Sequence, residues 1–297
     1  MSTNVQHCAN DVIINRQNSY VALKLLTSDC YGTEHDIFEI EILKAVAQHQ
    51  ALVGDIESTH VIELLDTFQL NGPTGIHECI AMPVLGGTLD AQAGRFPDPQ
   101  ITQMADGKPA EQVTPTVCEG QCGSVTIIDL GVASWIDRHL SDNIQSEHLR
   151  APEVILGAPW GPPVDIWSLG CLVIEFAKGH VAFPGAASQK GTWSSEDDHL
   201  AQYMEVLGPM PRELLQRGKK TREYFDESGN LLRIPELRTT TLKDFVDGAD
   251  GPFRRPPNMA TEEVPIFVDF LRGALALDPD VRKRAIDLLH HEWLRDG

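Results

Sequence analysis

The sequence predicts an α+β fold in which a small β-rich N-terminal part precedes a mainly helical C-terminal part. Short apolar runs bounded by turn residues, which are typical of strands, occur within the first 85 residues. After residue 125, amphipathic segments with helical periodicity dominate. One of these later segments, residues 164–177, is almost continuously apolar and is the third observation behind this fold class.

Residues 164–177 predict a helix at the centre of the C-terminal part. The stretch V-D-I-W-S-L-G-C-L-V-I-E-F-A places apolar side chains on every side of a helical wheel, so we expect it to be buried all round. Pro162 and Pro163 precede it and Gly179 follows it, which sets its limits. It is too short, and too charged at its ends, to span a bilayer. Burying it requires a sizeable helical domain.

The composition narrows the possible partners and the compartment. The chain has 297 residues and a formal net charge of −19, which argues against direct nucleic-acid binding and favours a basic protein partner. Six cysteines are scattered along the chain. Cys118 and Cys122 are spaced C-x3-C without a second pair of ligands nearby, so two loop thiols are favoured over a zinc site. The first residues carry no secretory signal, and we expect a reducing compartment.

A lysine in the middle of an apolar strand is the main anomaly of the N-terminal part. Tyr20–Leu26 has the pattern of a buried strand, and Lys24 lies in its middle, where an unpaired ammonium is costly. Either Lys24 extends to solvent from an edge strand, or it has a carboxylate partner. Residues 33–36 resemble a capping box, and a helix is predicted from about residue 36 to 48. Glu39 lies beside the apolar stripe of that helix and is the natural partner.

The remaining N-terminal segments predict a hairpin, an irregular stretch and a short strand. Residues 60–70 and 76–82 are strand-like and flank a turn at 71–75. Residues 88–124 lack periodicity, and residues 125–128, V-T-I-I, predict a short buried strand. Asp129 follows that strand, where it forms either an exposed carboxylate at a sheet end or a simple Asx turn.

Six short motifs, in this order and at these spacings, resemble a eukaryotic protein kinase domain. A V-A-x-K strand is followed by a helix glutamate, a D-F-G-like triplet, A-P-E, the D-x-W-S-x-G start of a central helix, and L-D-P-x-x-R. These motifs are Val21–Lys24, Glu39, Asp129–Gly131, Ala151–Glu153, Asp165–Gly170, and Leu277–Pro279 with Arg282. The resemblance implies a bilobal fold and ATP-dependent transfer of phosphate to serine or threonine.

Further segments resemble the SR-protein kinases, which phosphorylate serines in arginine/serine-rich splicing factors in the cytoplasm and nucleus. They are E-I-E-I-L-K at 39–44, H-V-I-E-L-L-D-T-F at 60–68, S-D-N-I-Q at 141–145, D-H-L at 198–200 and E-V-L-G-P-M-P at 205–211. Residues 107–113 also resemble an insertion of the fungal members. The resemblance covers about residues 12–90 and 125–295.

The kinase resemblance implies a role for individual residues in ATP and Mg²⁺ binding. Lys24 would hold the α- and β-phosphates and be oriented by Glu39, and Asp129 would ligate magnesium. Met82 would gate the adenine pocket, and Leu85 would belong to the connection between the lobes.

Other implied roles are structural or concern the substrate. Glu153 and Arg282 would form an internal ion pair, and Asp165 would begin the central helix. Asp198 and Glu205, seven residues apart on one helix face, would dock arginine-rich substrates. The alternative is that Asp198 caps its helix and Glu205 is solvated. His180 stands where the family often has another acid, which weakens the docking interpretation.

Two catalytic parts of a kinase have no match in the sequence. No G-x-G occurs, which suggests that the chain begins after the phosphate-covering loop, and no H-R-D-x-x-x-x-N occurs. We therefore expect an incomplete N-terminal lobe at 1–85, an irregular insert at 86–124 that replaces helices and the catalytic loop, and a C-terminal lobe at 125–297. The missing helix should leave an apolar patch exposed on residues 164–177 and an impaired fold. Catalysis would be impaired, and a non-catalytic pseudokinase-like binding module or a truncated fragment is the alternative.

Overall fold

The computed structural model describes residues 9–16, 19–26, 38–53, 60–85, 125–249, 253–256 and 259–295. These residues fall into two compact units, one formed by the residues up to 85 together with 125–140, and the other by those from 141 onward. Three features predicted from the sequence lie outside the described residues: the capping box at 33–36, the irregular insert at 86–124, and the Cys118–Cys122 pair. In the part of the chain that is described, no helix combines the length and apolarity needed to cross a bilayer.

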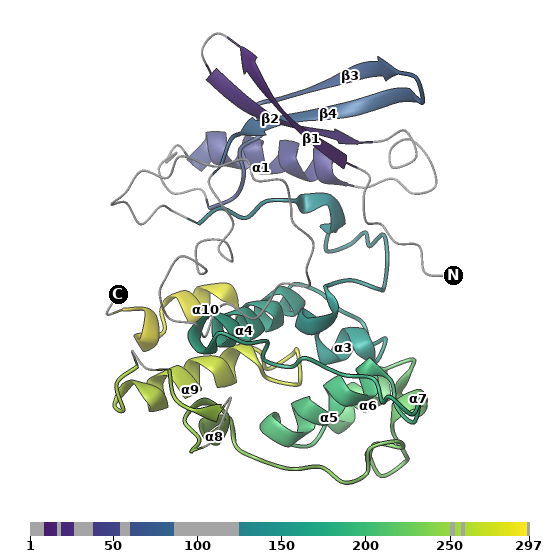
Figure 1. Cartoon of the computed structure of the whole chain (residues 1–297), viewed down its shortest axis with the longest axis vertical. Helices are drawn as coiled ribbons and strands as arrows, with labels where there is room; N and C mark the ends of the chain where they lie inside the picture. Colours follow the sequence, from purple (N-terminus) through teal and green to yellow (C-terminus); the bar gives the residue numbers. More distant parts are fainter. Residues whose placement is uncertain are drawn as a thin grey trace. The chain divides into compact units, whose positions relative to one another are not determined.

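The first unit contains a four-stranded antiparallel sheet whose strands follow the order β1-β2-β4-β3 (Figure 1). The predicted strand and hairpin are confirmed, and the hairpin closes with Gly72 opposite Gly75. The hairpin begins later than expected, because residues 62–65 are not part of a strand. The strands are β1 Ala9–Arg16, β2 Ser19–Leu26, β3 Asp66–Gly72 and β4 Gly75–Pro83.

Helix α1, Glu39–Val53, lies along one face of this sheet (Figure 1). Its buried residues Ile40 and Leu43 pack against apolar side chains of the sheet in a small core. Glu39 belongs to the first turn, where a carboxylate is favoured by the helix dipole. The other buried members of this core are Leu26, Ile62 and Ile80.

The segment after the irregular stretch does not form the predicted buried strand. Ile127 makes only an isolated parallel bridge to Val61, and Ile127 is 59% exposed. Val125 and Ile128 are about half exposed as well. A strand of this composition is buried only when neighbouring strands or helices cover it, and the described part of the unit provides one bridge. The prediction of a buried strand was therefore wrong.

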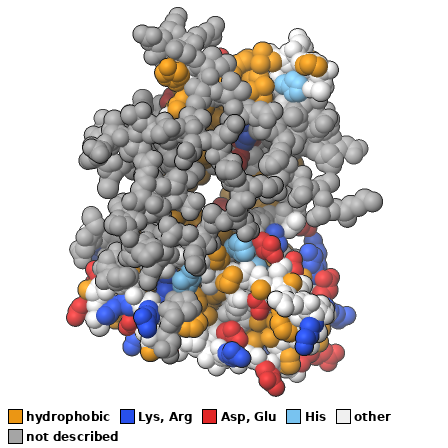
Figure 2. Space-filling view, viewed as in Figure 1, with side chains coloured by type: hydrophobic (Ala, Val, Ile, Leu, Met, Phe, Trp, Pro, Cys, Tyr) orange, Lys and Arg blue, Asp and Glu red, His pale blue; other side chains and the backbone are white. Residues whose placement is uncertain are grey.

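The second unit is mostly helical, as predicted (Figure 1). Its α-helices are α3 Pro152–Ile155, α4 Pro163–Lys178, α5 Ser195–Leu207, α6 Arg212–Arg217, α7 Thr221–Tyr224, α8 Leu242–Val246, α9 Glu263–Ala274 and α10 Ala285–Leu289. Single 3-10 turns occur at Glu147–Leu149 and Glu292–Leu294, and another, Leu130–Val132, belongs to the first unit. On the face drawn in Figure 2, the described part of this unit mixes hydrophobic side chains with charges of both signs.

One face of α4 forms the centre of the second core, which confirms the predicted helix. Trp167 is fully buried, and its ring centroid lies 4.8 Å from that of Tyr203, which in turn lies 4.9 Å from that of Phe183. Gly170 allows α9 to approach closely, because a Cβ there would lie 2.7 Å from Leu275 Cδ2. The helix ends at Gly179, whose φ of 71° suits glycine.

The opposite face of α4 is not buried, so the expectation of burial all round was wrong. Leu169 is 41% and Phe176 is 46% exposed. They lie seven residues apart and therefore on the same side of the helix, with Asp165. Leu169 and Phe176 therefore form an exposed apolar patch on α4, as the sequence analysis expects for residues 164–177.

Candidate active site

Lys24 lies on the central part of the sheet in the first unit. Its strand, β2, pairs with β1 on one side and with β4 on the other, opposite Ile80. The interpretation of Lys24 as a lysine extending from an edge strand is therefore excluded. The neighbouring residue Leu23 is buried, and the side chain of Lys24 is 14% exposed, so its ammonium needs partners within the protein.

Glu39 is the first of these partners. Its Oε1 accepts a hydrogen bond from Lys24 Nζ at 2.7 Å, and its side chain is 1% exposed. The helical periodicity of α1 explains this position, since Ile40 and Leu43 anchor the adjoining face in the core. The pairing that the sequence predicted is therefore present.

Asp129 is the second partner. Its Oδ1 accepts a hydrogen bond from Lys24 Nζ at 2.5 Å, although its side chain is 74% exposed. The residue adopts a left-handed backbone conformation, with φ 60° and ψ 71°, which is uncommon for a residue other than glycine. The carboxylate is exposed, as expected, but it follows a single bridge and not a strand.

Gly131 permits the close approach of these three side chains. A Cβ at that position would lie 3.3 Å from Asp129 Oδ1, 3.4 Å from Glu39 Oε2 and 3.6 Å from Lys24 Nζ. A larger side chain there would crowd the charged groups. The D-L-G triplet thus supplies both a charge and the space around it.

The two carboxylates determine the ionisation of Lys24. Burial alone would lower the pKa of this lysine, but the hydrogen bonds and negative charges of Asp129 and Glu39 outweigh burial and raise it. Lys24 is therefore a fixed positive charge at neutral pH, with one partner in the protein interior and the other facing solvent. Lys24 can neutralise a phosphate once Asp129 releases it and binds a cation instead.

The two residues expected near the adenine lie on and after β4. Met82 pairs with Ala22 across β2 and β4 and packs against the small core. Leu85 follows the end of β4 at Pro83 and is about 40% exposed. Both belong to the same unit as Lys24.

Sequence reasoning missed a contact between α1 and the segment after Asp129. Arg138 Nη2 donates to Glu41 Oε1 at 2.7 Å, and the Arg138 guanidinium lies 4.2 Å from the centre of the Phe38 ring. Glu41 is about half exposed. Arg138 also forms an isolated antiparallel bridge with Trp135, which was not predicted from the sequence.

The second unit contains the predicted internal ion pair. Arg282 donates from Nη1 and Nη2 to the two carboxylate oxygens of Glu153, at 2.6 and 3.0 Å, and both side chains are completely buried. Arg282 also bonds to the carbonyls of Ala276 and Pro163, and it lies over the ring of Trp167. The pair fixes the start of α3 against the core.

Asp165 lies in the first turn of α4, as the sequence predicts. Desolvation by its surroundings raises the pKa of its carboxyl, although the residue itself remains exposed.

The two residues expected to dock substrates lie on α5 and accept hydrogen bonds from within the protein. Asp198 Oδ2 accepts from Ala186 N at 2.8 Å and from Gln202 Nε2 at 2.7 Å. Glu205 Oε1 accepts from Arg238 N at 2.7 Å. The alternative, in which Asp198 caps the helix and Glu205 is solvated, is therefore wrong. Ser194 and Asp197 cap the helix, and Glu205 is half-buried.

Comparisons with known proteins identify the family of the C-terminal part of the chain. The family model described as protein kinase domain matches residues 117–294. The chain is 38% identical over 172 residues to the serine/threonine-protein kinase SKY1 of Saccharomyces cerevisiae, covering 58% of this chain and 22% of that protein. It is 34% identical over 211 residues to spk-1 of Caenorhabditis elegans, covering 70% and 20%. Mouse SRSF protein kinase 3 is 35% identical over 170 residues, covering 57% and 28%.

The matched part of the chain spans about a fifth of the length of the SKY1 and spk-1 kinases. The matched region includes Asp129, the Glu153–Arg282 pair and the whole of α4. The relatives are kinases of the SR-protein type. The chain therefore belongs to the protein kinase family, in the branch of the SR-protein kinases.

Proposed function

We propose that this chain binds ATP and Mg²⁺ in the manner of an SR-protein kinase and that its phosphoryl transfer to serine is impaired. The observation that carries the proposal is the cluster in which Lys24 bonds to both Glu39 and Asp129. Protein kinases use ATP with a divalent metal, and their catalysis consists mostly of positioning and charge neutralisation.

Within this cluster each side chain has a separate task. Glu39 is buried and holds Lys24 in place, while Lys24 offers its charge to the α- and β-phosphates. Asp129 faces solvent and can exchange Lys24 for a metal ion when the phosphates take over the lysine. Bound ATP would supply the γ-phosphoryl group that is transferred, and ADP would leave. Met82 and Leu85 are proposed to border the adenine.

The protein groups near Lys24 that could bind a metal suit a magnesium ion that is held mainly by its nucleotide. Among the residues that the structure describes, no group of three His, Cys, Asp or Glu side chains could hold a metal alone. Mg²⁺ in phosphate-transferring sites is usually held by one or two carboxylates, with phosphates and waters completing the octahedron. Asp129 is one such carboxylate. Its exposure and its competition with Lys24 indicate weak metal binding when ATP is absent.

Impaired transfer follows from the sequence. The chain contains no H-x-D, and the only D-x-x-x-x-N, Asp66 to Asn71, lies in β3. No residue therefore matches the family's proton acceptor for the substrate hydroxyl, nor its second metal ligand. Loss of a general base commonly lowers the rate by about 10²–10⁴-fold.

The proposed partner is a basic, arginine/serine-rich protein such as a splicing factor, in the cytoplasm or nucleus. The name of one relative, SRSF protein kinase 3, indicates such a substrate for that protein. The net charge of −19 favours basic partners in general. Both hydrogen bonds that Asp198 accepts use Oδ2, which leaves Oδ1 for an arginine of the partner.

Calorimetry and a transfer assay on the full chain test this proposal together. Titration with ATP and magnesium should release heat that Lys24→Met abolishes, and transfer to an arginine/serine-repeat peptide should be slow. Absence of binding heat from the unmodified chain would refute the nucleotide site. Rapid transfer that depends on Lys24 would refute the impairment.

A non-catalytic module is the second candidate, favoured by two observations. The proton acceptor is absent, and apolar surface is exposed on α4 at Leu169 and Phe176 and on the segment around Ile127. A pseudokinase-like binder would bind ATP and the peptide but transfer no phosphate above a protein-free blank. A defective fragment would show neither binding nor a cooperative unfolding transition.

A further inference from the structure

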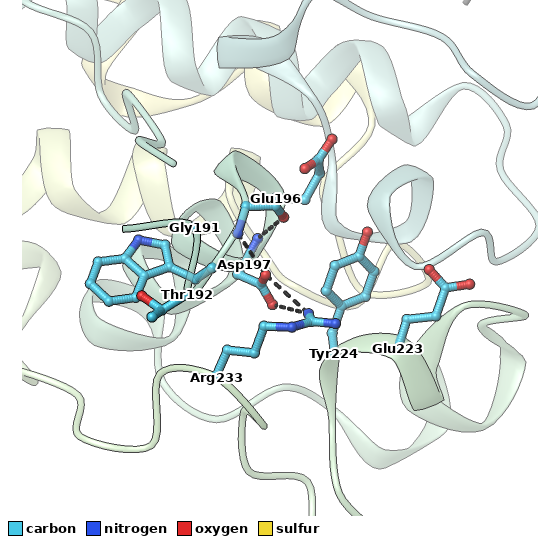
Figure 3. A pocket seen from close by; sticks show the side chains of 9 residues that line it. Gly191, Thr192, Glu196, Asp197, Glu223, Tyr224 and Arg233 are labelled. Carbon is cyan, nitrogen blue, oxygen red and sulfur yellow. Dashed lines mark hydrogen bonds and ion pairs between the residues drawn. The ribbon is translucent and has the colours of Figure 1, made fainter. Parts of the chain in front are cut away.

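A hollow beside the first turns of α5 is not used by the proposed ATP site (Figure 3). It measures about 490 Å³ and lies entirely within the second unit. Its lining combines two aromatic rings, three carboxylates and one arginine, contributed by the residues before α5, by α5 itself, by α7 and by the segment after it. These side chains are Trp193, Tyr224, Glu196, Asp197, Glu223 and Arg233.

One arginine of the chain already occupies part of this hollow. Arg233 Nη1 donates to both oxygens of Asp197, at 2.7 and 3.0 Å, and this pair is drawn in Figure 3. Asp197 is buried and also closes the capping box with Ser194. Its charge is therefore balanced within the protein, and Asp197 with Arg233 forms a neutral wall of the hollow.

The other two carboxylates leave the hollow with a negative charge. Glu196 and Glu223 lie on either side of Tyr224, whose hydroxyl points to the side of the hollow where both carboxylates lie (Figure 3). Burial and the charges of Glu196, Glu223 and Asp197 raise the pKa of Tyr224 to about 12. Glu196 is ionised, because hydrogen bonds from its own backbone N–H and from Ser194, together with the charge of Arg150, outweigh its burial and lower its pKa.

An aromatic wall beside two carboxylates is suited to a cation. The rings of Trp193 and Tyr224 offer π faces, and Trp193 is partly exposed to an incoming group. A planar guanidinium can stack on such a ring while donating hydrogen bonds to a carboxylate, which an ammonium does less well. The chemistry therefore favours arginine over lysine.

We propose that this hollow binds an arginine side chain of the basic polypeptide that the chain recognises. The inference rests on the proposed function for the class of partner, but the hollow is a different place from the proposed docking residues. Glu196 and Asp198 are two residues apart on α5, so their side chains are separated by about 200° around the helix axis. The hollow is thus a second anchor on another side of α5.

The test replaces Glu196 and Glu223, the two carboxylates outside the Asp197–Arg233 pair, and keeps that pair. Glu196→Gln with Glu223→Gln should weaken binding of an arginine/serine-repeat peptide by about tenfold or more, as expected for a lost charge-assisted contact. The matched control is Glu213→Gln with Glu292→Gln, two acids outside the hollow with the same change in charge. The control should change the dissociation constant by less than about twofold because surface charges are screened. Equal effects of the two double variants would overturn the inference.

A small probe separates this inference from the proposed function. N-acetyl-arginine amide should shift the indole N–H resonance of Trp193, assigned with Trp193→Phe, and the shift should disappear in the Glu196/Glu223 double variant. A shift without any peptide binding would support the hollow and count against the proposed partner. Peptide binding without the shift, and unaffected by the double variant, would contradict the hollow alone. Unchanged circular dichroism melts of all variants exclude unfolding as the cause.

Discussion

Two charge clusters, one in each unit, differ in how far they are closed to solvent. In the second unit, Arg282 and Glu153 are completely buried, and the guanidinium bonds in addition to two backbone carbonyls. In the first unit, Lys24 is held by a buried glutamate on one side and by a 74% exposed aspartate on the other. The Arg282 cluster has no position for a ligand, whereas the Lys24 cluster can replace one partner.

The comparison teaches that similar ion pairs serve different purposes according to their burial. A closed, desolvated pair fixes structure, because neither charge tolerates the loss of the other. An open cluster keeps a charge in place and lets the exposed partner change. Stability should therefore depend most on Arg282, and nucleotide binding most on Lys24 and Asp129.

The largest effect on stability is expected from Arg282→Met. This change leaves Glu153 buried without its cation and should lower the free energy of unfolding by about 3–5 kcal/mol. Urea denaturation followed by circular dichroism measures the loss. Arg284→Met is the control, since it removes an exposed arginine paired with Asp287 and should leave the midpoint unchanged. Equal midpoints for the two variants would show that the buried pair has no special structural role.

A smaller loss is expected from Glu39→Gln in the first unit. The buried amide keeps a hydrogen-bond acceptor for Lys24 but removes the charge, at a cost of about 1–3 kcal/mol. The same variant should weaken ATP binding, because Lys24 is no longer held in its position. Full stability together with wild-type ATP affinity would contradict the role given to Glu39.

Asp129→Asn should separate binding from stability. The side chain is exposed, so the unfolding midpoint should change little, but magnesium-dependent ATP binding should be lost. Calorimetry with and without magnesium measures the effect, and Asp137→Asn, which changes an exposed acid eight residues later, is the control. If the Asp129→Asn variant binds ATP in magnesium as tightly as the unmodified chain does, Asp129 is not the metal ligand.

The smallest effect concerns pH and compares Lys24 with Lys178. Lys178 is buried at the end of α4 and donates to the carbonyls of Phe245, Val246 and Arg254. Burial lowers its pKa from 10.5 to about 8, despite the opposing charge of Asp247. Between pH 8 and 10.5 the unfolded chain holds a proton that the folded chain has released, so this lysine makes stability rise with pH.

Lys24 acts in the opposite direction because its pKa is raised. Its contribution to stability is complete below pH 10.5 and is lost as the pH rises through the raised value. Unfolding free energies of the unmodified chain and of Lys178→Met from pH 7 to 10.5 test the sign for Lys178, and those of the unmodified chain and of Lys24→Met above pH 10.5 test the sign for Lys24. The free energy of unfolding of the unmodified chain, relative to that of Lys178→Met, should increase above pH 8. A decrease in this difference above pH 8 would be inconsistent with a lowered pKa of Lys178.

The sequence predicted those features that depend on local periodicity or on a motif. The Lys24–Glu39 pair was predicted because Lys24 lies on an apolar strand and Glu39 lies beside the apolar face of a helix. The Glu153–Arg282 pair followed from two kinase motifs, and α4 followed from its length and composition.

Features that depend on packing partners could not be predicted in the same way. Val125 and Ile127 look buried from their composition, yet they are exposed because burial requires neighbours that the described chain does not supply. The Arg138–Glu41 contact and the choice of Asp197 over Asp198 for the α5 cap depend on loop geometry. The arrangement of side chains in the hollow beside α5 likewise needed coordinates.

A single-turnover experiment tests the central claim most directly. The full chain, in excess over radiolabelled ATP with magnesium and an arginine/serine-repeat peptide, is filtered at increasing times and the bound label is identified. The account predicts protein-bound label that is recovered as intact ATP and is lost in Lys24→Met. Rapid appearance of phosphoserine on the peptide, or no bound label in the unmodified chain, would contradict it.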